Sequence, residues 1–235
     1  MAARAHLISL ATAVPPHILW QRDVAAAAQR MFGDRYDAFG RLAKVFETAG
    51  IVKRHGVRPI EWYVEPRGWP ERTAAYLDGA EALFVAAGGE ALDKAGLTAG
   101  DVDCVVTVSS TGIATPSLEA RVLARMGFRA DVMRVPVFGL GCAGGVSGLS
   151  IAARLAEARP GSIVLLVAVE LCTLAFRLDE LTKANIVATA CSGTARPPAS
   201  SAPAAASPRS RAPPSTPGRR RSTSWAGTSI RSASG

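Results

Sequence analysis

Three apolar runs of strand length alternate with helical patterns in the middle of the chain. The runs lie at residues 103–110, 132–138 and 162–171, and each is rich in valine or other large apolar side chains. Between them, residues 116–128 and 142–158 have the composition and apolar spacing of helices. Continuous apolar strands that alternate with helices are typical of an α/β protein whose sheet is covered on both faces. We therefore predict an α/β fold with buried strands at these three positions.

The first hundred residues carry weaker patterns. Asp23 can cap a helix that runs to about Met31, and a long helix is expected to start near Pro70 and to loosen at Gly88 and Gly89. The remaining expected elements are a short strand at residues 7–10, a second helix at residues 36–48, and a short basic strand and turn at residues 51–59.

The last 45 residues have a different composition from the rest. From Cys191 onward the chain contains seven arginines and no Asp, Glu or Lys, and its only large apolar residues are Trp225 and Ile230. The net charge of the whole chain is +8, so residues 1–190 carry only 8 − 7 = +1. The basic character therefore belongs to the tail, and we expect no nucleic-acid partner for the folded part.

The four cysteines, Cys104, Cys142, Cys172 and Cys191, show no spacing typical of a metal site. No basic and apolar leader opens the chain, and no apolar run reaches the length of about 18 residues that a membrane span needs. We expect a cytoplasmic protein with reduced thiols, no metal or cofactor, and no membrane partner.

Cys142 stands where an apolar strand ends and a helix of small residues begins. Gly139 and Gly141 precede it and permit a tight turn. The unpaired N–H groups and the dipole at a helix N-terminus favour the thiolate, which is the nucleophilic form, and can hold an oxyanion. Most cysteines are instead buried as small hydrophobic residues. We retain that interpretation for Cys104, inside a strand, and predict a nucleophile at Cys142.

Four separated segments resemble one family. "GWPERTAAYL", "TVSSTGIATPSLEARV", "GLGCAGGVSGL" and "VAVELCTLAFR" occur in the order found in bacterial type III polyketide synthases, the chalcone and stilbene synthase family. The resemblance covers nearly all of residues 5–190. It implies a thiolase-like fold and a homodimer that loads an acyl group from an acyl-CoA onto a cysteine. The family then extends this group by decarboxylative condensation with malonyl-CoA, without a carrier protein or a metal.

The resemblance assigns roles residue by residue. Cys142 corresponds to the acyl-accepting nucleophile, and Ser110 and Thr111 to residues that line the cavity beside it. Thr115 matches a position that reaches the cavity of the partner subunit. These roles are implied by the aligned motifs alone.

Cys172 and Ala175 stand where plant chalcone synthases carry two threonines. Their smaller or less polar side chains imply a more apolar cavity, so we expect a long-chain aliphatic starter and an alkylresorcinol or alkylpyrone product. The alternative, that the two positions only repack, stays open. We expect Glu170 to tie down a strand end, and Lys53 and Arg54 to belong to a solvated charged face.

The family's other catalytic residues, a histidine and an asparagine, belong to the second half of the fold. Here the histidines are His6, His17 and His55, and the asparagine is Asn185, none in a matching motif. We therefore expect the chain as written to be inactive.

The family pattern breaks at residue 191, where Leu-Phe-Gly-Asp-Gly-Ala-Ala-Ala is expected. Codons for that segment, read with one base removed, give Cys-Ser-Gly-Thr-Ala-Arg-Pro-Pro, which are residues 191–198. The same frame turns residues 222–230 into a segment that contains the family motif Met-Gly-Trp-Asp. We therefore interpret the tail as out-of-frame translation of a GC-rich gene. A disordered basic arm that binds nucleic acid is the alternative.

The predicted organisation is an incomplete N-terminal half of a thiolase-like fold at residues 1–190, layered around a mixed sheet, and a disordered tail at residues 191–235. The predicted function is that of an acyltransferase that transfers groups other than aminoacyl groups, of the type III polyketide synthase class. Two alternatives are kept open. One is a condensing enzyme similar to the ketoacyl-carrier-protein synthases of the third type, and the other is a non-enzymatic protein with a basic tail that binds nucleic acid.

Overall fold

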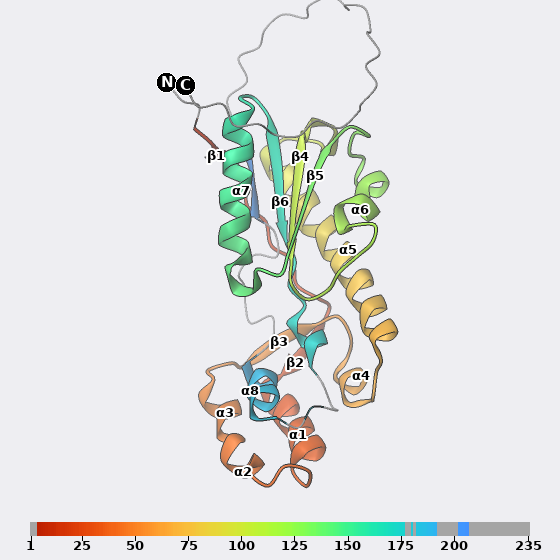
Figure 1. The fold of residues 1–235 in the computed structure, drawn as a ribbon, viewed down its shortest axis with the longest axis vertical. Coiled ribbons are helices and arrows are strands. Elements are labelled where there is room, and N and C mark those ends of the chain that lie inside the picture. The colour runs from red at the N-terminus through yellow and green to blue at the C-terminus, as the bar shows by residue number, and fades with distance from the viewer. Residues whose placement is uncertain (1–3, 177–179, 181, 192–201, 207–235) are drawn as a thin grey trace, which may run out of the picture.

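The computed structural model describes residues 4–176, 180 and 182–191, and the backbone of residues 202–206. These residues form two lobes (Figure 1). The sheet lobe is built around a five-stranded sheet, and the small lobe consists of short helices around a two-stranded sheet.

The sheet lobe contains the strands β1 (His6–Leu7), β4 (Cys104–Ser109), β5 (Met133–Phe138), β6 (Ile163–Ala168) and β7 (Ala202–Ala206). Its helices are α5 (Trp69–Ala95), α6 (Leu118–Met126) and α7 (Gly144–Ala158), with short 3₁₀ helices η1 (Ala99–Asp101), η2 (Gly141–Ala143) and η3 (Cys172–Ala175). The small lobe and its connection contain β2 (His17–Trp20), β3 (Lys53–Gly56), α1 (Gln21–Phe32), α2 (Phe39–Leu42), α3 (Lys44–Thr48), α4 (Ile60–Val64) and α8 (Lys183–Cys191).

The strand order in the large sheet is β1-β7-β6-β4-β5. Strands β4, β5 and β6 are parallel, and β7 runs antiparallel to both β6 and β1. All three strands predicted in the middle of the chain are present, and the sheet is mixed as expected.

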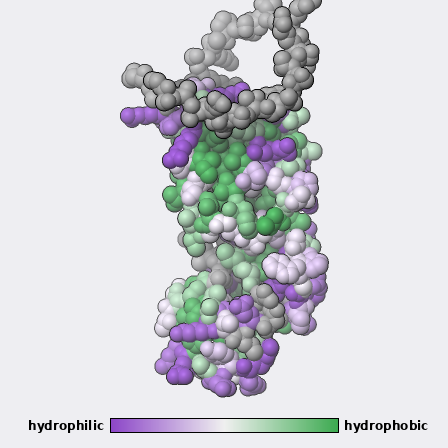
Figure 2. Space-filling view, in the orientation of Figure 1, coloured by the Kyte–Doolittle hydropathy of each residue, from purple (hydrophilic) through white to green (hydrophobic). Residues whose placement is uncertain are grey.

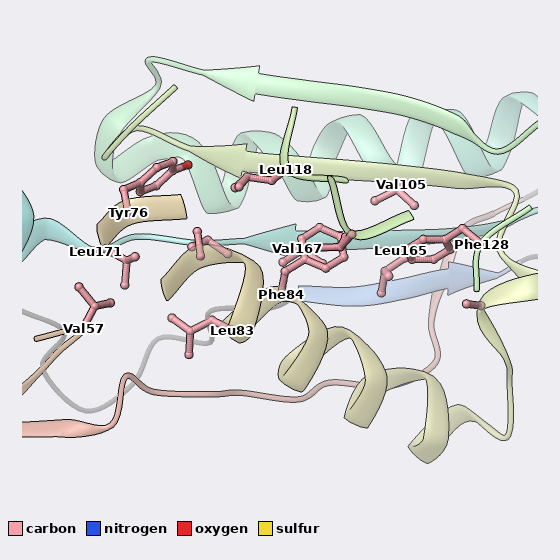
Figure 3. Close-up of a cluster of buried hydrophobic side chains, with 14 of the residues drawn as sticks. Val57, Tyr76, Leu83, Phe84, Val105, Leu118, Phe128, Leu165, Val167 and Leu171 are labelled. Atoms are coloured by element: carbon pink, nitrogen blue, oxygen red, sulfur yellow. The ribbon is translucent and has the colours of Figure 1, made fainter. Parts of the chain in front are cut away.

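One face of the sheet is covered by α5, which Figure 3 shows against the strands, and by α6, whose Leu118 and Val122 belong to the same buried cluster. Phe84 of α5 is completely buried, and Val105, Leu165 and Val167 of the central strands belong to the same cluster. Burial of such side chains contributes about 1.5–3 kcal/mol each. Helix α5 is continuous through residues 88 and 89, so the predicted loosening there is wrong. Gly88 is itself buried, and a Cβ added there would make only ordinary contacts, 3.5 Å or more from its neighbours.

The other face is covered by α7, which packs Ala152 and Ala156 against Val106 and Leu166. A Cβ added to Gly148 would lie 2.6 Å from Val108 Cγ2, so the backbone of α7 approaches β4 directly. The small residues of this helix therefore serve close packing on the sheet, as a slim helix should.

Strand β5 is an exposed edge strand rather than the buried strand predicted from its apolar sequence. Met133 and Phe138 are about half exposed, with relative solvent-accessible surfaces of 50% and 55%. Pro136 lies inside this strand, opposite Thr107 in the register. A proline has no N–H to donate, which suits a strand that pairs on one side only.

Residues 202–206, which belong to the tail predicted to be disordered, form strand β7 between β1 and β6, and the disorder of the tail as a whole stays a prediction. Leu166 is paired with Ala202 and Val164 with Ala205, which leaves one extra residue on β7. The irregularity lies beside Pro203, which cannot donate to a neighbouring strand. Pairing satisfies backbone groups of β1 and β6 and depends little on side-chain identity. The frame-slip segments at residues 192–198 and 222–230 lie outside the described residues.

The small lobe differs most from the predictions. Helix α1 begins at Gln21 and not at Asp23, the predicted helix at residues 36–48 is divided into α2 and α3, and β2, α4 and α8 were not predicted. The short strands β2 and β3 pair with each other. In the described ranges, no helix has the length and apolar character to cross a membrane.

Arg54 is 1% exposed, which corrects its assignment to a solvated face, whereas Lys53 is exposed as expected. The Arg54 guanidinium donates to the carbonyls of Thr189 (2.8 Å) and Ala190 (2.7 Å) at the end of α8. Cations are favoured at the C-terminus of a helix. Burial lowers the pKa of Arg54. This residue therefore fastens α8 to β3 within the small lobe.

Candidate active site

The predicted site residues gather at the carboxyl edge of the parallel strands. Ser110 and Thr111 follow β4, Cys142 follows β5 after a short turn, and Cys172 and Ala175 follow β6. Because β6, β4 and β5 are adjacent and parallel, their carboxyl ends meet at one edge of the sheet. Ligands of open α/β sheets commonly bind at that edge.

Glu170 links two of these strand ends. Its carboxylate accepts from the Ser110 backbone N–H at 2.7 Å and from the Thr111 hydroxyl at 2.6 Å. The Thr111 oxygen in turn accepts from the Leu171 N–H at 2.9 Å. Glu170 thus ties down the strand end, in agreement with its predicted structural part.

The turn that carries Cys142 requires glycine at two positions. Gly139 and Gly141 have φ values of 82° and 53°, in the left-handed region that other residues rarely occupy. The Gly141 N–H donates to the Ser110 hydroxyl oxygen at 2.9 Å. Cys142 follows at once, inside η2 and immediately before α7, with an exposed side chain.

The first turn after Cys142 differs from a simple helix start. The Ala143 N–H donates to the Leu140 carbonyl at 3.2 Å, and the Gly144 N–H donates to the Gly141 carbonyl. Both donors are therefore engaged in the 3₁₀ turn. The sequence-based expectation that unpaired N–H groups here hold an oxyanion does not apply to these two.

Hydrogen bonds from helix α5 hold the η3 turn, which contains Cys172 and Ala175. Arg72 of α5 donates to the carbonyls of Leu174 (2.7 Å) and Phe176 (2.6 Å). Burial raises the pKa of the Cys172 thiol, and the Glu170 carboxylate and the Cys142 thiol raise it further.

A cavity of about 730 Å³ opens beside these strand ends. Ser110, Thr111 and Ala175 line it, together with Phe138 of β5 and Tyr76 of α5. Its volume lies within the range of pockets that bind small ligands. Cys142 is not among the residues that line this cavity, although Phe138 at its wall ends the strand that leads to the cysteine turn.

A second cavity of about 80 Å³ lies behind η3, toward the small lobe. Its walls are mostly apolar, with Leu19, Val24, Met31 and Ile60 among them. Ala175 lines both cavities, so it stands in the wall that they share.

Cys172 and Asn185 also line the second cavity. Sequence reasoning gave Asn185 no role, because it lies in no matching family motif. Arg72 was missed too, although it lies in one of the segments that resemble the family, since its partners are backbone carbonyls that no sequence pattern reveals.

Thr115 is not brought to this cluster. Its side chain is exposed and lines neither cavity, so its predicted contact with a partner subunit stays a prediction. The histidines lie elsewhere: His6 is in β1, His17 is in β2, and His55 in β3 contacts the Pro15 carbonyl through Nδ1 at 3.1 Å. Within the described ranges, no three His, Cys, Asp or Glu side chains gather as a metal site would require.

The sequence model for the family "Chalcone and stilbene synthases, N-terminal domain" matches residues 1–197. The chain belongs to this family. It therefore belongs to the type III polyketide synthases, which favours that class over the carrier-protein-dependent condensing enzymes left open above.

Two curated relatives show how far the similarity extends. A 1,3,6,8-tetrahydroxynaphthalene synthase of Streptomyces peucetius subsp. caesius is 42% identical over 182 residues, which are 77% of this chain and 48% of the relative. A relative from Bacillus subtilis (strain 168) is 36% identical over 194 residues, 80% of this chain and 53% of the relative. The chain thus spans about half the length of these family members.

Among solved structures, 1,3,6,8-tetrahydroxynaphthalene synthase from Streptomyces coelicolor A3(2), a bacterial type III polyketide synthase, superposes with a TM-score of 0.76 at 29% identity. The match covers 85% of this chain and 55% of that structure. The predicted thiolase-like α/β fold of a type III polyketide synthase N-terminal half is confirmed.

Proposed function

We propose that this chain supplies the nucleophile and one cavity wall of a type III polyketide synthase. Cys142 would accept an acyl group from an acyl-CoA: its thiolate attacks the thioester carbonyl and the CoA thiolate leaves. Malonyl-CoA would then lose CO₂, and the resulting carbanion would attack the acyl carbonyl and release Cys142. The observation that carries the proposal is the position of Cys142, on a glycine-dependent turn at the carboxyl edge of β5 and directly before α7.

The residues of this half would act on the acyl group and not on the proton transfers. The family resemblance assigns thiolate activation, decarboxylation and oxyanion binding to a histidine and an asparagine of a second half. The engaged N–H groups of Ala143 and Gly144 support that division, because two donors of the η2 turn are already used. We propose that the 235-residue chain, without a second half of the fold, does not catalyse condensation with malonyl-CoA.

Two exposed features favour additional protein surface around the site. The outer side of α7 exposes Val146 and Leu149, and β5 has an unpaired edge among the described strands. Figure 2 shows hydrophobic side chains gathered on this face of the sheet lobe. We propose that a second half of the fold covers α7 and that the enzyme is a homodimer, in which Thr115 reaches the partner's cavity. We further propose the frame slip at residue 191 as the origin of the tail.

For the substrate, we propose a long-chain aliphatic starter that gives an alkylresorcinol or alkylpyrone. Ala175 stands at the wall between the larger cavity and the apolar one, Cys172 lines the apolar cavity, and neither carries a hydroxyl group. The apolar cavity has room only for the end of an alkyl chain, so the larger cavity would hold the rest. The name of the Streptomyces peucetius relative favours a second candidate, a synthase that makes a tetrahydroxynaphthalene.

The test uses protein from a gene in which one inserted base before codon 191 restores the family frame. It is supplied with malonyl-CoA alone, with a fatty acyl-CoA, or with coumaroyl-CoA. We expect alkyl products from the fatty acyl-CoA, and about a tenfold loss of that activity in Ala175→Leu, the amount that a misfitted bulky side chain costs in a packed site. Ala86→Leu, at an exposed position of α5, is the control.

Product formed equally well from malonyl-CoA alone would favour the naphthalene-forming alternative. A preference for coumaroyl-CoA would refute the long-chain starter. An unchanged starter preference in Ala175→Leu would show that this wall does not select the starter.

A further inference from the structure

A continuous series of hydrogen bonds connects the end of β6 to the turn that carries Cys142. It starts at the Glu170 carboxylate, passes to Ser110 through the backbone N–H at 2.7 Å, and ends where the Ser110 hydroxyl accepts from the Gly141 N–H at 2.9 Å. Gly141 is the residue directly before Cys142. Three strand ends, those of β6, β4 and β5, are therefore joined by one path that terminates beside the cysteine.

The geometry at both ends of this path fixes the orientation of the groups that take part in it. The carboxylate of Glu170 uses one oxygen for Ser110 and the other for Thr111, so its plane is fixed at both ends. Hydrogen bonds to an ionised acceptor are stronger than those between neutral groups. The Ser110 hydroxyl then accepts from Gly141, whose φ is 53°. Because Gly141 has no side chain, no side-chain contact of its own holds this backbone conformation.

We propose that Glu170 and Ser110 are positioning residues, which hold the Gly141 turn so that Cys142 stands at the start of η2 and α7. This proposal rests on the assignment of Cys142 as the nucleophile. It adds that neither Glu170 nor the Ser110 hydroxyl needs to touch the acyl group for the cysteine to depend on them. Without the Ser110 oxygen, the Gly141 N–H turns to water, and the glycine-rich turn can move Cys142 away from the helix start.

The position of Cys142 can be measured in the 235-residue chain itself, without condensation activity. Iodoacetamide alkylates a thiolate, with formation of a carbon–sulfur bond and release of iodide, and peptide mass spectrometry gives the rate at each cysteine. Cys191 is also exposed and serves as an internal reference, and the buried Cys104 reports unfolding when it becomes labelled. The quantity compared is the ratio of the Cys142 rate to the Cys191 rate.

The decisive variants are Ser110→Ala, which removes the acceptor, and Ser110→Thr, which keeps it. The matched control is Ser109→Ala, one residue earlier on β4, which removes a hydroxyl that accepts from Tyr76 at 2.9 Å and has no link to the cysteine turn. We expect the ratio to fall about fivefold in Ser110→Ala, the change that one ordinary net hydrogen bond represents. It should recover in Ser110→Thr and remain unchanged in Ser109→Ala.

The outcomes separate this proposal from the proposed function. The nucleophile assignment itself is tested by acylation of Cys142 in frame-restored protein, and a failure there would leave the Cys142-to-Cys191 ratio measured here unaffected. A ratio that Ser110→Ala leaves intact would overturn the positioning proposal alone. An equal fall in Ser109→Ala would also overturn it, because general loosening would then explain the effect. If Ser110→Ala exposes Cys104, Glu170→Gln decides by the same ratio, with a fall expected and an unchanged ratio counting against the proposal.

Discussion

The two faces of the large sheet are covered to different extents. On one face, α5 and α6 bury Phe84, Leu165 and Val167 in an extensive cluster (Figure 3). On the other face, α7 makes a smaller cluster through alanines and glycines, and its outer side leaves Val146 77% exposed. Cys142, in the η2 turn that precedes α7, is exposed as well.

The two faces therefore have different parts in the molecule: one contributes most of the packing, and the other carries the candidate nucleophile. The α5 face supplies the packing that holds β4 and β6 in place, whereas the α7 face places a thiol at the surface of the described residues. The thin, close packing of α7 brings the start of that helix against the carboxyl end of β4. The candidate site therefore rests on a well-packed sheet, while its cysteine is exposed at the surface of the described residues.

The largest expected effect comes from the covered face. Phe84→Ala should lower the free energy of unfolding by about 3–5 kcal/mol, because it removes a completely buried ring and leaves a cavity. Val146→Ala, on the exposed side of α7, should change it by less than about 0.5 kcal/mol. Urea unfolding followed by circular dichroism measures both. Similar losses in the two variants would mean that the outer side of α7 is buried in solution.

A smaller effect is expected where α7 contacts the sheet. Gly148→Ala should cost about 1–3 kcal/mol, because its Cβ would lie 2.6 Å from Val108 and 3.0 Å from Leu166. Gly145→Ala lies on the same helix with no atom within 4 Å of the added Cβ, and should stabilise by up to about 1 kcal/mol through helix propensity. The same unfolding measurement applies. A neutral Gly148→Ala would show that α7 can move off β4.

The smallest effect concerns pH. Burial, with the Asp103 carboxylate nearby, raises the pKa of Cys104 from 9.0 to about 11. The unfolded chain therefore loses this proton first as the pH rises, so the stability due to Cys104 is complete below pH 9 and is lost toward pH 11.

We expect the free energy of unfolding to fall by about 1–2 kcal/mol more in the unchanged chain than in Cys104→Ala over that pH range. Parallel pH profiles for the two proteins would contradict the burial of this thiol in solution.

The sequence predicted the central part of the fold well because the strands there are long and apolar. Residues 103–110 and 162–171 form the buried strands β4 and β6. The exposure of β5 was missed because its neighbours in the sheet, and not its own composition, decide whether a strand lies at an edge. The small lobe was missed for a related reason: its helices are short, and its fastening through Arg54 depends on carbonyls 135 and 136 residues away.

For the candidate site, the sequence predicted which residues follow the strand ends, and parallel strands then bring them together. Ser110, Thr111, Cys172 and Ala175 lie at that edge with Cys142. The path from Glu170 to Gly141 could not be predicted, because it depends on distances between three strand ends. The shared wall at Ala175 likewise appears only when η3 is placed between two cavities.

The most direct test of the account is the site of acylation. Protein from the frame-restored gene is incubated with a radiolabelled fatty acyl-CoA, digested, and analysed for the peptide that carries the label. We predict one acyl group on the peptide that contains Cys142, and none bound to Cys142→Ala. Label that persists in Cys142→Ala, or that falls on Cys172 in the unchanged protein, would contradict the assignment of Cys142 as the acyl acceptor.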